Sequence, residues 1–256
     1  MSESPVYVIS DIHLGAVPES TEIAFRRFLD VVRHEASELL INGDLFDFWF
    51  EYRTVVPARH YRVLAGLAEV ADAGVRIRFL GGNHDAWGGR FLRDEVGIEI
   101  LPDHAVIDLA GMTALVVHGD GVGSGDLGYR ALKRFIRNPM VVRIFRFVHP
   151  DWGDRLARFV STTEDKAGNA GGTNPVRAEQ LRQWARAEIE GRSELDLVLA
   201  GHTHTPVVEE VRPGRYYVNT GDWINHFTYL VLARGCPPEL RVWETKEGRG
   251  GGQIET

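Results

Sequence analysis

The sequence predicts an α/β fold in which strands and helices alternate through the first half of the chain. Short apolar runs, typical of buried strands, recur along the chain. Segments with the apolar spacing of amphipathic helices separate the first three runs. This order favours parallel neighbouring strands, because each helix returns the chain to the same end of the sheet.

Five of these runs are predicted to be buried strands. They cover residues 6–9, 39–41, 75–80, 114–117 and 195–200. Helices are expected at 21–35, 57–73 and 175–191. Gly74 follows the second helix, as glycine often does just beyond a helix C-terminus. The third helix has Asn174 as its N-cap and begins with Pro175, whose missing N–H is not needed there.

The last quarter of the chain changes from helices to hairpins. Pro213-Gly214, a dipeptide typical of turns, separates two strand-like segments. The expected strand pairs are 207–211 with 216–218, and 227–232 with 240–243. These strands are expected to build a second sheet or to extend the first.

An insertion at about 123–172 interrupts the alternation between the fourth and fifth runs. It contains helical patterns in which aromatic and basic residues alternate. Its basic residues are Arg130, Lys133, Arg134, Arg137, Arg143, Arg146, Arg155 and Arg158. One interpretation is a lid that binds an anionic amphiphile and contacts an anionic membrane surface. The other is that the arginine stems merely cover apolar surface.

Composition favours one globular domain, residues 1–256, that includes this insertion. The chain is 44% hydrophobic and 25% charged, and its single cysteine, Cys236, excludes an intramolecular disulfide. The net charge of −7 argues against a nucleic-acid partner. The N-terminus lacks the pattern of a secretory signal, and no apolar run approaches the roughly 20 residues of a membrane span. A cytoplasmic location is therefore expected.

Polar side chains follow each of the five predicted strands. The segments are Asp11-Ile12-His13, Gly43-Asp44, Gly82-Asn83-His84-Asp85, His118-Gly119-Asp120 and Gly201-His202-Thr203-His204. Each segment alone has an ordinary explanation, such as a helix cap, a turn or a buried core histidine. Because binding sites form at the carboxyl ends of strands in open α/β sheets, the series predicts one site built from five loops.

The residue types in these loops predict a metal centre. Carboxylate, amide and imidazole ligands suit Mn²⁺, Fe²⁺ or Zn²⁺, and no thiolate is present. The candidate ligands are Asp11, His13, Asp44, Asn83, His118, His202 and His204. Seven ligands exceed the need of one ion and suit two ions sharing a carboxylate, about 3.5–4 Å apart, a geometry used for phosphoester hydrolysis. His84 is then free to face the substrate, and Asp85 is expected to orient its imidazole.

At these residues the chain resembles the calcineurin-like metallophosphoesterases. Their pattern D-x-H, G-D, G-N-H-D, H and G-H-x-H is present in order, and the resemblance spans roughly residues 6–225. It implies two packed mixed β-sheets flanked by helices, and it makes His84 the catalytic histidine. It also implies the ligand sets: Asp11, His13, Asp44 and His204 for one ion, and Asp44, Asn83, His118 and His202 for the other.

Within that family the chain most resembles the enzymes that cleave the diphosphate of UDP-2,3-diacylglucosamine. The resemblance rests on the segments 43–49, 118–120 and 126–130. It implies Mn²⁺ as the metal, UMP and 2,3-diacylglucosamine 1-phosphate as products, and a lid in which Asp126 and Tyr129 contact the substrate. The chain has His84 where the best-known branch has arginine.

Two alternatives to this lipid substrate stay open. One is a phosphodiesterase or phosphatase of the same fold that acts on a water-soluble phosphoester or nucleotide. The other is a scaffold without activity, which would be expected to have lost metal ligands.

Overall fold

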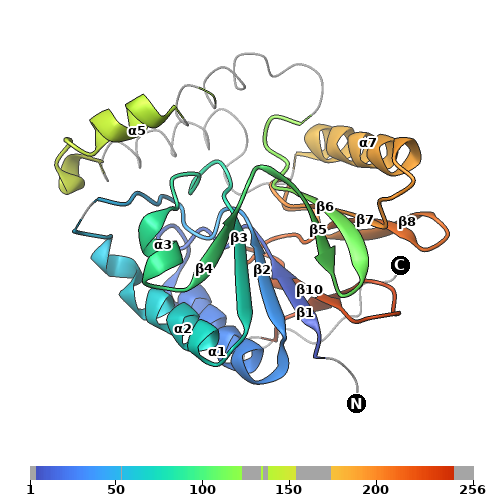
Figure 1. Ribbon diagram of the computed structural model, residues 1–256, viewed down its shortest axis with the longest axis horizontal. Helices are drawn as coiled ribbons and strands as arrows, with labels where there is room; N and C mark the ends of the chain where they lie inside the picture. Colours follow the sequence, from blue (N-terminus) through green and yellow to red (C-terminus); the bar gives the residue numbers. More distant parts are fainter. Residues whose placement is uncertain (1–3, 53, 123–133, 135–137, 154–173, 245–256) are drawn as a thin grey trace.

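The computed structural model describes residues 4–52, 54–122, 134, 138–153 and 174–244, and consists of two β-sheets with flanking helices (Figure 1). The first sheet has the strand order β11-β10-β1-β2-β3-β4, and the second has the order β5-β6-β7-β9-β8. Both sheets contain parallel and antiparallel pairs. The α/β class and the two mixed sheets are therefore confirmed.

The alternating first half forms the parallel part of the first sheet. Strands β1 (Val6–Ile9), β2 (Glu38–Asn42), β3 (Arg76–Leu80) and β4 (Ile98–Leu101) lie side by side in parallel. Helices α1 (Glu19–Glu35) and α2 (Tyr61–Asp72) connect the first three strands, as predicted, and α2 is preceded by a 3-10 turn, Ala58–His60. Gly74 has φ +89°, as expected for a residue just beyond a helix.

The hairpins of the last quarter are divided between the two sheets. Strands β8 (Val207–Arg212) and β9 (Arg215–Asn219) belong to the second sheet, together with β5 (His104–Leu109), β6 (Met112–Val117) and β7 (Leu197–Ala200). Strands β10 (Thr228–Leu232) and β11 (Glu239–Val242) extend the first sheet. Thus both expectations for these strands hold. The sequence did not predict β4, β5 or the short helix α3 (Arg90–Asp94).

Successive side chains of a strand point to opposite faces of its sheet, and the apolar core accordingly forms three layers. Val6 and Val8 of β1 pack between the two sheets, whereas Tyr7 and Ile9 face the layer that contains α1 and α2. On the far side of the second sheet, Leu115 and Val117 join apolar residues of helix α7 (Pro175–Gly191). Both ends of α7 fall where the sequence predicts them, and the Asn174 side chain accepts a hydrogen bond from the backbone N–H of Arg177.

Part of the insertion is described as helix α5 (Pro139–Phe145). The Asn138 side chain caps its start. The Phe145 ring packs against Phe50 and Trp87, with centroid distances of 4.6 and 5.0 Å. The helix expected in this part of the insertion is therefore present. Asp126 and Tyr129 lie outside the described residues, and the full extent of the insertion stays a prediction.

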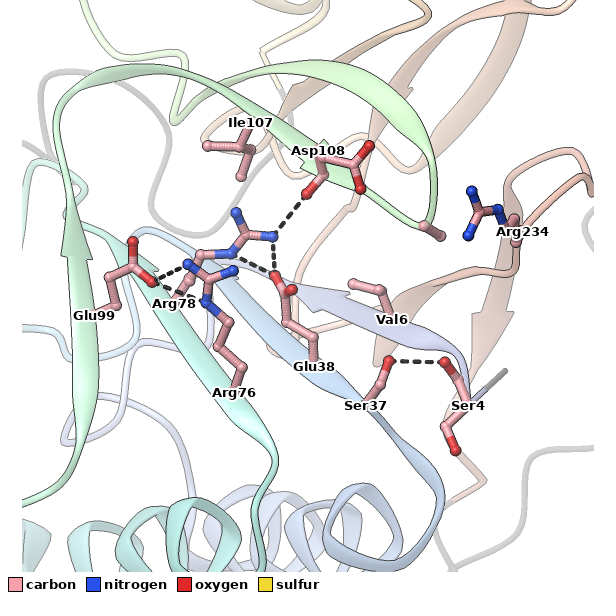
Figure 2. A pocket seen from close by; sticks show the side chains of 11 residues that line it. Ser4, Val6, Ser37, Glu38, Arg76, Arg78, Glu99, Ile107, Asp108 and Arg234 are labelled. Atoms are coloured by element: carbon pink, nitrogen blue, oxygen red, sulfur yellow. Dashed lines mark hydrogen bonds and ion pairs between the residues drawn. The ribbon is translucent and has the colours of Figure 1, made fainter. Parts of the chain in front are cut away.

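A buried ion pair joins the two sheets at the end where β1, β2 and β3 begin (Figure 2). The Arg78 side chain is 4% exposed, contacts the Glu38 carboxylate, and donates a hydrogen bond of 2.9 Å to the backbone oxygen of Asp108 in β5. A cavity of about 600 Å³ opens beside this pair. Burial raises the pKa of Glu38, and Arg78 opposes that shift.

Replacing Arg78 by methionine is expected to lower the free energy of unfolding by about 3–5 kcal/mol, because the Glu38 charge is left buried without a partner. The double variant Arg78→Met/Glu38→Met should recover most of this loss. The control is Arg76→Met, which removes the ion pair between Arg76 and Glu99. The Arg76 side chain is 58% exposed, so this substitution should lower the free energy of unfolding by less than about 1 kcal/mol. Urea unfolding measures all three variants, and equal losses for Arg76→Met and Arg78→Met would contradict the prediction.

Candidate metal centre

The five predicted loops meet at the junction of the two sheets. Loops after β1, β2 and β3 come from the first sheet, and those after β6 and β7 come from the second. The expected convergence of the five loops is therefore present, and it involves both sheets. Ligand atoms within 4.8 Å of one another form three groups among the described residues. These are Asp11, His13 and His204; Asp44, His118 and His202; and His13, Asp44 and His84.

Asp11 connects the loop after β1 with the loop after β7. Its buried carboxylate accepts a hydrogen bond of 2.9 Å from the backbone N–H of His202 and lies 3.2 Å from His204 Nε2. Burial alone would raise the pKa of Asp11, but its bond to His204 keeps that pKa below the usual value. A Cβ at Gly201 would lie 2.5 Å from Asp11 Oδ2, so only glycine allows this approach.

Asp44 occupies the centre of the group. Its Oδ1 accepts a hydrogen bond of 3.0 Å from the backbone N–H of His84, and its Oδ2 lies 3.1 Å from His118 Nε2 and 3.8 Å from His13 Nε2. Burial opposes ionisation of Asp44, but His118 and then His84 hold its pKa well below the usual value. This carboxylate is therefore charged and faces ligands of both predicted ions.

His118 and His202, which lie beside Asp44, have pKa values shifted in opposite directions. His118 Nδ1 lies 2.9 Å from the backbone oxygen of Asn42, which fixes the ring with Nε2 toward Asp44. Burial would lower the pKa of His118, but the charge of Asp44 raises it well above the usual value. For His202, burial and then the charge of His118 lower the pKa to about 4, so this ring is neutral and offers a lone pair.

The residues present fit divalent cations. His13 Nε2 and Asn83 Oδ1 are both buried, and neither has a hydrogen-bond partner within the described ranges. Buried polar atoms without partners are rare in proteins, because losing hydration without compensation costs free energy. Divalent cations bound at the sheet junction would satisfy these two atoms. The surrounding donors are all oxygen or nitrogen, as Mn²⁺, Fe²⁺ and Zn²⁺ accept.

Backbone strain is concentrated at the same residues. In the described parts of the chain, seven non-glycine residues have a positive φ, and five of these are candidate ligands. They are Asp11, His13, Asp44, His202 and His204, with φ between +51° and +65°. Such conformations are unfavourable for residues with a Cβ and persist where the surrounding structure enforces them, commonly at functional sites.

The structure corrects the expected role of Asp85. Both oxygens of its buried carboxylate accept backbone N–H groups, from Gly82, Asp44 and Phe46, rather than facing the His84 imidazole. His84 Nδ1 instead lies 2.9 Å from the backbone oxygen of Asp47 and 3.6 Å from its Oδ1. The sequence analysis missed Asp47, whose position three residues after Asp44 was the available signal.

The aromatic stretch after Asp44 has two roles. Phe46 and Trp49 are fully buried and stack on each other with a centroid distance of 4.5 Å. Phe48 is half-buried and lies 6.3 Å from the ring of Phe145 in α5. The first two residues therefore belong to the core, and the third contacts the insertion.

Comparison with known proteins gives a consistent assignment. The sequence profile of the calcineurin-like phosphoesterases matches residues 4–206. A UDP-2,3-diacylglucosamine hydrolase of Porphyromonas gingivalis is 33% identical, over 89% of this chain and 94% of the relative. Proteins of the same name from Ralstonia nicotianae and Neisseria gonorrhoeae are 31% and 30% identical, covering 86% and 92% of this chain and 84% and 98% of the relatives. The chain belongs to the calcineurin-like phosphoesterase family and is a metal-dependent phosphoester hydrolase.

Proposed function

We propose that this enzyme hydrolyses the diphosphate of UDP-2,3-diacylglucosamine to UMP and 2,3-diacylglucosamine 1-phosphate. The observation that carries the proposal is the similarity to relatives of that name over nearly the whole chain, including the segment of the insertion. The clustered ligand atoms at the sheet junction support the same chemistry, because they suit ions that act on a phosphoryl group.

Two divalent ions are assigned to the seven predicted ligands. Asp11, His13, Asp44 and His204 would hold one ion, and Asp44, Asn83, His118 and His202 the other. Mn²⁺ is the proposed metal, with Fe²⁺ and Zn²⁺ as alternatives. When bound, such ions polarise phosphoryl oxygens and lower the pKa of water, which supplies a nucleophile at neutral pH.

His84 is the proposed catalytic residue. Its side chain is 14% exposed at the edge of the cluster, and Asp47 contacts its Nδ1. This contact fixes the orientation of the ring, and we assign its Nε2 to the substrate. When the bond between phosphorus and the bridging oxygen breaks, this imidazole either protonates the leaving oxygen or stabilises the charge that develops on phosphate.

Product release from the acylated substrate tests the proposal. Purified protein loaded with Mn²⁺ is mixed with UDP-2,3-diacylglucosamine in detergent micelles, and UMP is quantified by chromatography. The expected result is UMP release that exceeds hydrolysis of bis-p-nitrophenyl phosphate and of cyclic nucleotides. No UMP release, together with turnover of a soluble diester, would instead favour the water-soluble alternative.

We further propose that α5 and the residues after it contact an anionic membrane surface. Met140, Ile144 and Phe147 recur at helical spacing and are 67%, 63% and 87% exposed, and Trp152 is 65% exposed. Arg143 and Arg146 are exposed beside them. Apolar side chains flanked by arginines suit the interface of an anionic bilayer. Among the described helices, none has the length and apolar character that a membrane crossing requires.

Removing both arginines is expected to weaken vesicle binding. Each basic residue near an anionic surface contributes about 1 kcal/mol, so Arg143→Gln/Arg146→Gln should reduce affinity about 30-fold. Cosedimentation with vesicles containing anionic lipid measures this loss. The control, Arg33→Gln/Arg93→Gln, removes the same charge from exposed ion pairs elsewhere and should bind as wild type does. Equal binding by both double variants would contradict membrane contact through α5.

A further inference from the structure

A buried carboxylate lies beneath the candidate metal centre without being one of its expected ligands. Asp85 is 0% exposed. Its Oδ1 accepts backbone N–H groups from Gly82 at 2.8 Å and from Asp44 at 3.2 Å, and its Oδ2 accepts that of Phe46 at 3.2 Å. Charge-assisted hydrogen bonds of this kind are among the stronger ones in proteins.

These bonds join two loops that each carry metal-site residues. Asp44 and Phe46 lie in the loop after β2, whereas Gly82, Asn83 and His84 lie in the loop after β3. A bond in the reverse direction completes the connection, because the backbone N–H of His84 donates to Asp44 Oδ1. Each loop therefore supplies a carboxylate that binds the backbone of the other.

The space between the loops leaves little freedom for other arrangements. A Cβ at Gly82 would lie 2.1 Å from Asp44 Oδ1 and 2.7 Å from the Asp44 backbone nitrogen. The two loops are thus in direct contact at the residue before Asn83. A small displacement of either loop would change the distance between Asp44 and Asn83, which are the shared ligand and a ligand of the second ion in the proposed assignment.

We propose that Asp85 is a positioning residue that sets the separation of Asp44 from Asn83 and His84, and so controls metal affinity. This inference rests on the proposed ligand assignment. It gives Asp85 no contact with substrate and no part in proton transfer. Residues that orient metal ligands typically change metal affinity by about 10–100-fold when they are replaced, and Asp85 is expected to fall in that range.

The chain contains a matched control in Glu51. This carboxylate is also buried, and it accepts the backbone N–H groups of Gly89, Phe91 and Leu92 at 2.8, 2.9 and 3.3 Å. It therefore fixes the start of α3 much as Asp85 fixes the two loops. Among the described residues, none of its hydrogen-bond partners is a candidate metal ligand.

The experiment compares Asp85→Asn with Glu51→Gln. Mn²⁺ affinity is measured by calorimetry on both variants and on the wild type, and the unfolding temperature is measured in the presence of a chelator. The asparagine amide keeps one acceptor but turns an NH₂ group toward a backbone N–H. Asp85→Asn is expected to weaken Mn²⁺ binding about 10–100-fold, with activity restored by excess Mn²⁺. Glu51→Gln should lower the unfolding temperature and leave Mn²⁺ affinity within about twofold.

Unchanged Mn²⁺ affinity in Asp85→Asn, with stability losses like those of Glu51→Gln, would overturn the proposal and make Asp85 purely structural. If Asp85→Asn does not fold, Asp85→Glu and Glu51→Asp replace the pair, since each moves a carboxylate by one methylene. Weaker Mn²⁺ binding only in Asp85→Glu supports the proposal, and equal affinity in both contradicts it. The readout is metal affinity, so a wild-type protein that binds Mn²⁺ but releases no UMP would remove the substrate proposal and leave this one standing.

Discussion

Replacing Asp44 by asparagine is expected to reduce kcat/KM by at least about 1,000-fold, or about 4 kcal/mol of transition-state stabilisation. Asp44 is buried between His118 and His13, and it is the proposed shared ligand of both ions. The substitution keeps the side-chain shape and removes its charge. We therefore expect the metal content to fall together with the activity, because neither ion retains its full ligand set.

Metal analysis by mass spectrometry and steady-state kinetics on the same preparation test this expectation. Circular dichroism reports whether the fold persists. The control is Asp108→Asn, which removes an equal charge from an exposed side chain at the opposite end of the strands. An Asp44→Asn enzyme that keeps two ions and most of its activity would contradict the assignment of Asp44 as the shared ligand.

Replacing His84 by glutamine should separate metal binding from turnover. The ring of His84 packs edge-on against His13, at a centroid distance of 4.8 Å, but the resemblance places it outside both ligand sets. General acid catalysis typically contributes about 100- to 10,000-fold, so kcat should fall within that range while both ions stay bound. Loss of metal in proportion to activity would show that His84 acts as a ligand.

The choice of leaving group distinguishes the two roles proposed for His84. If it protonates the leaving oxygen, the loss should be large for the natural diphosphate and small for a p-nitrophenyl ester, whose leaving group needs no proton. If it stabilises charge on phosphate, both substrates should lose activity alike. His34→Gln, an exposed histidine on α1, is the control and should match the wild type on both substrates.

Local patterns explain why much of the fold could be predicted. Strand β1 and helix α7 have the bounds that the sequence indicates, because an unbroken apolar run and an Asn-Pro cap are both local signals. Helix α3 and strand β4 were missed. Helix α3 is only about one turn long, which is too short to show a helical repeat of apolar residues. Only one of the four residues of β4 is buried, so this strand lacks the regular burial that marks a strand in the sequence.

The candidate site could be predicted as a set of residues but not as a geometry. The series of motifs identified the side chains that cluster. That they lie at the junction of two sheets depends on pairings such as that of β6 with β7, which lie far apart in the sequence. The left-handed backbone of Asp11 and Asp44, and the partners of Asp47 and Asp85, likewise arise from contacts between distant loops.

X-ray diffraction from crystals grown with Mn²⁺, recorded at the manganese absorption edge, tests the central claim most directly. We predict two anomalous peaks about 3.5–4 Å apart, with a carboxylate oxygen of Asp44 within bonding distance of both. One peak should lie among Asp11, His13 and His204, and the other among Asn83, His118 and His202. The absence of peaks at the sheet junction, or a single ion held by other side chains, would contradict the account.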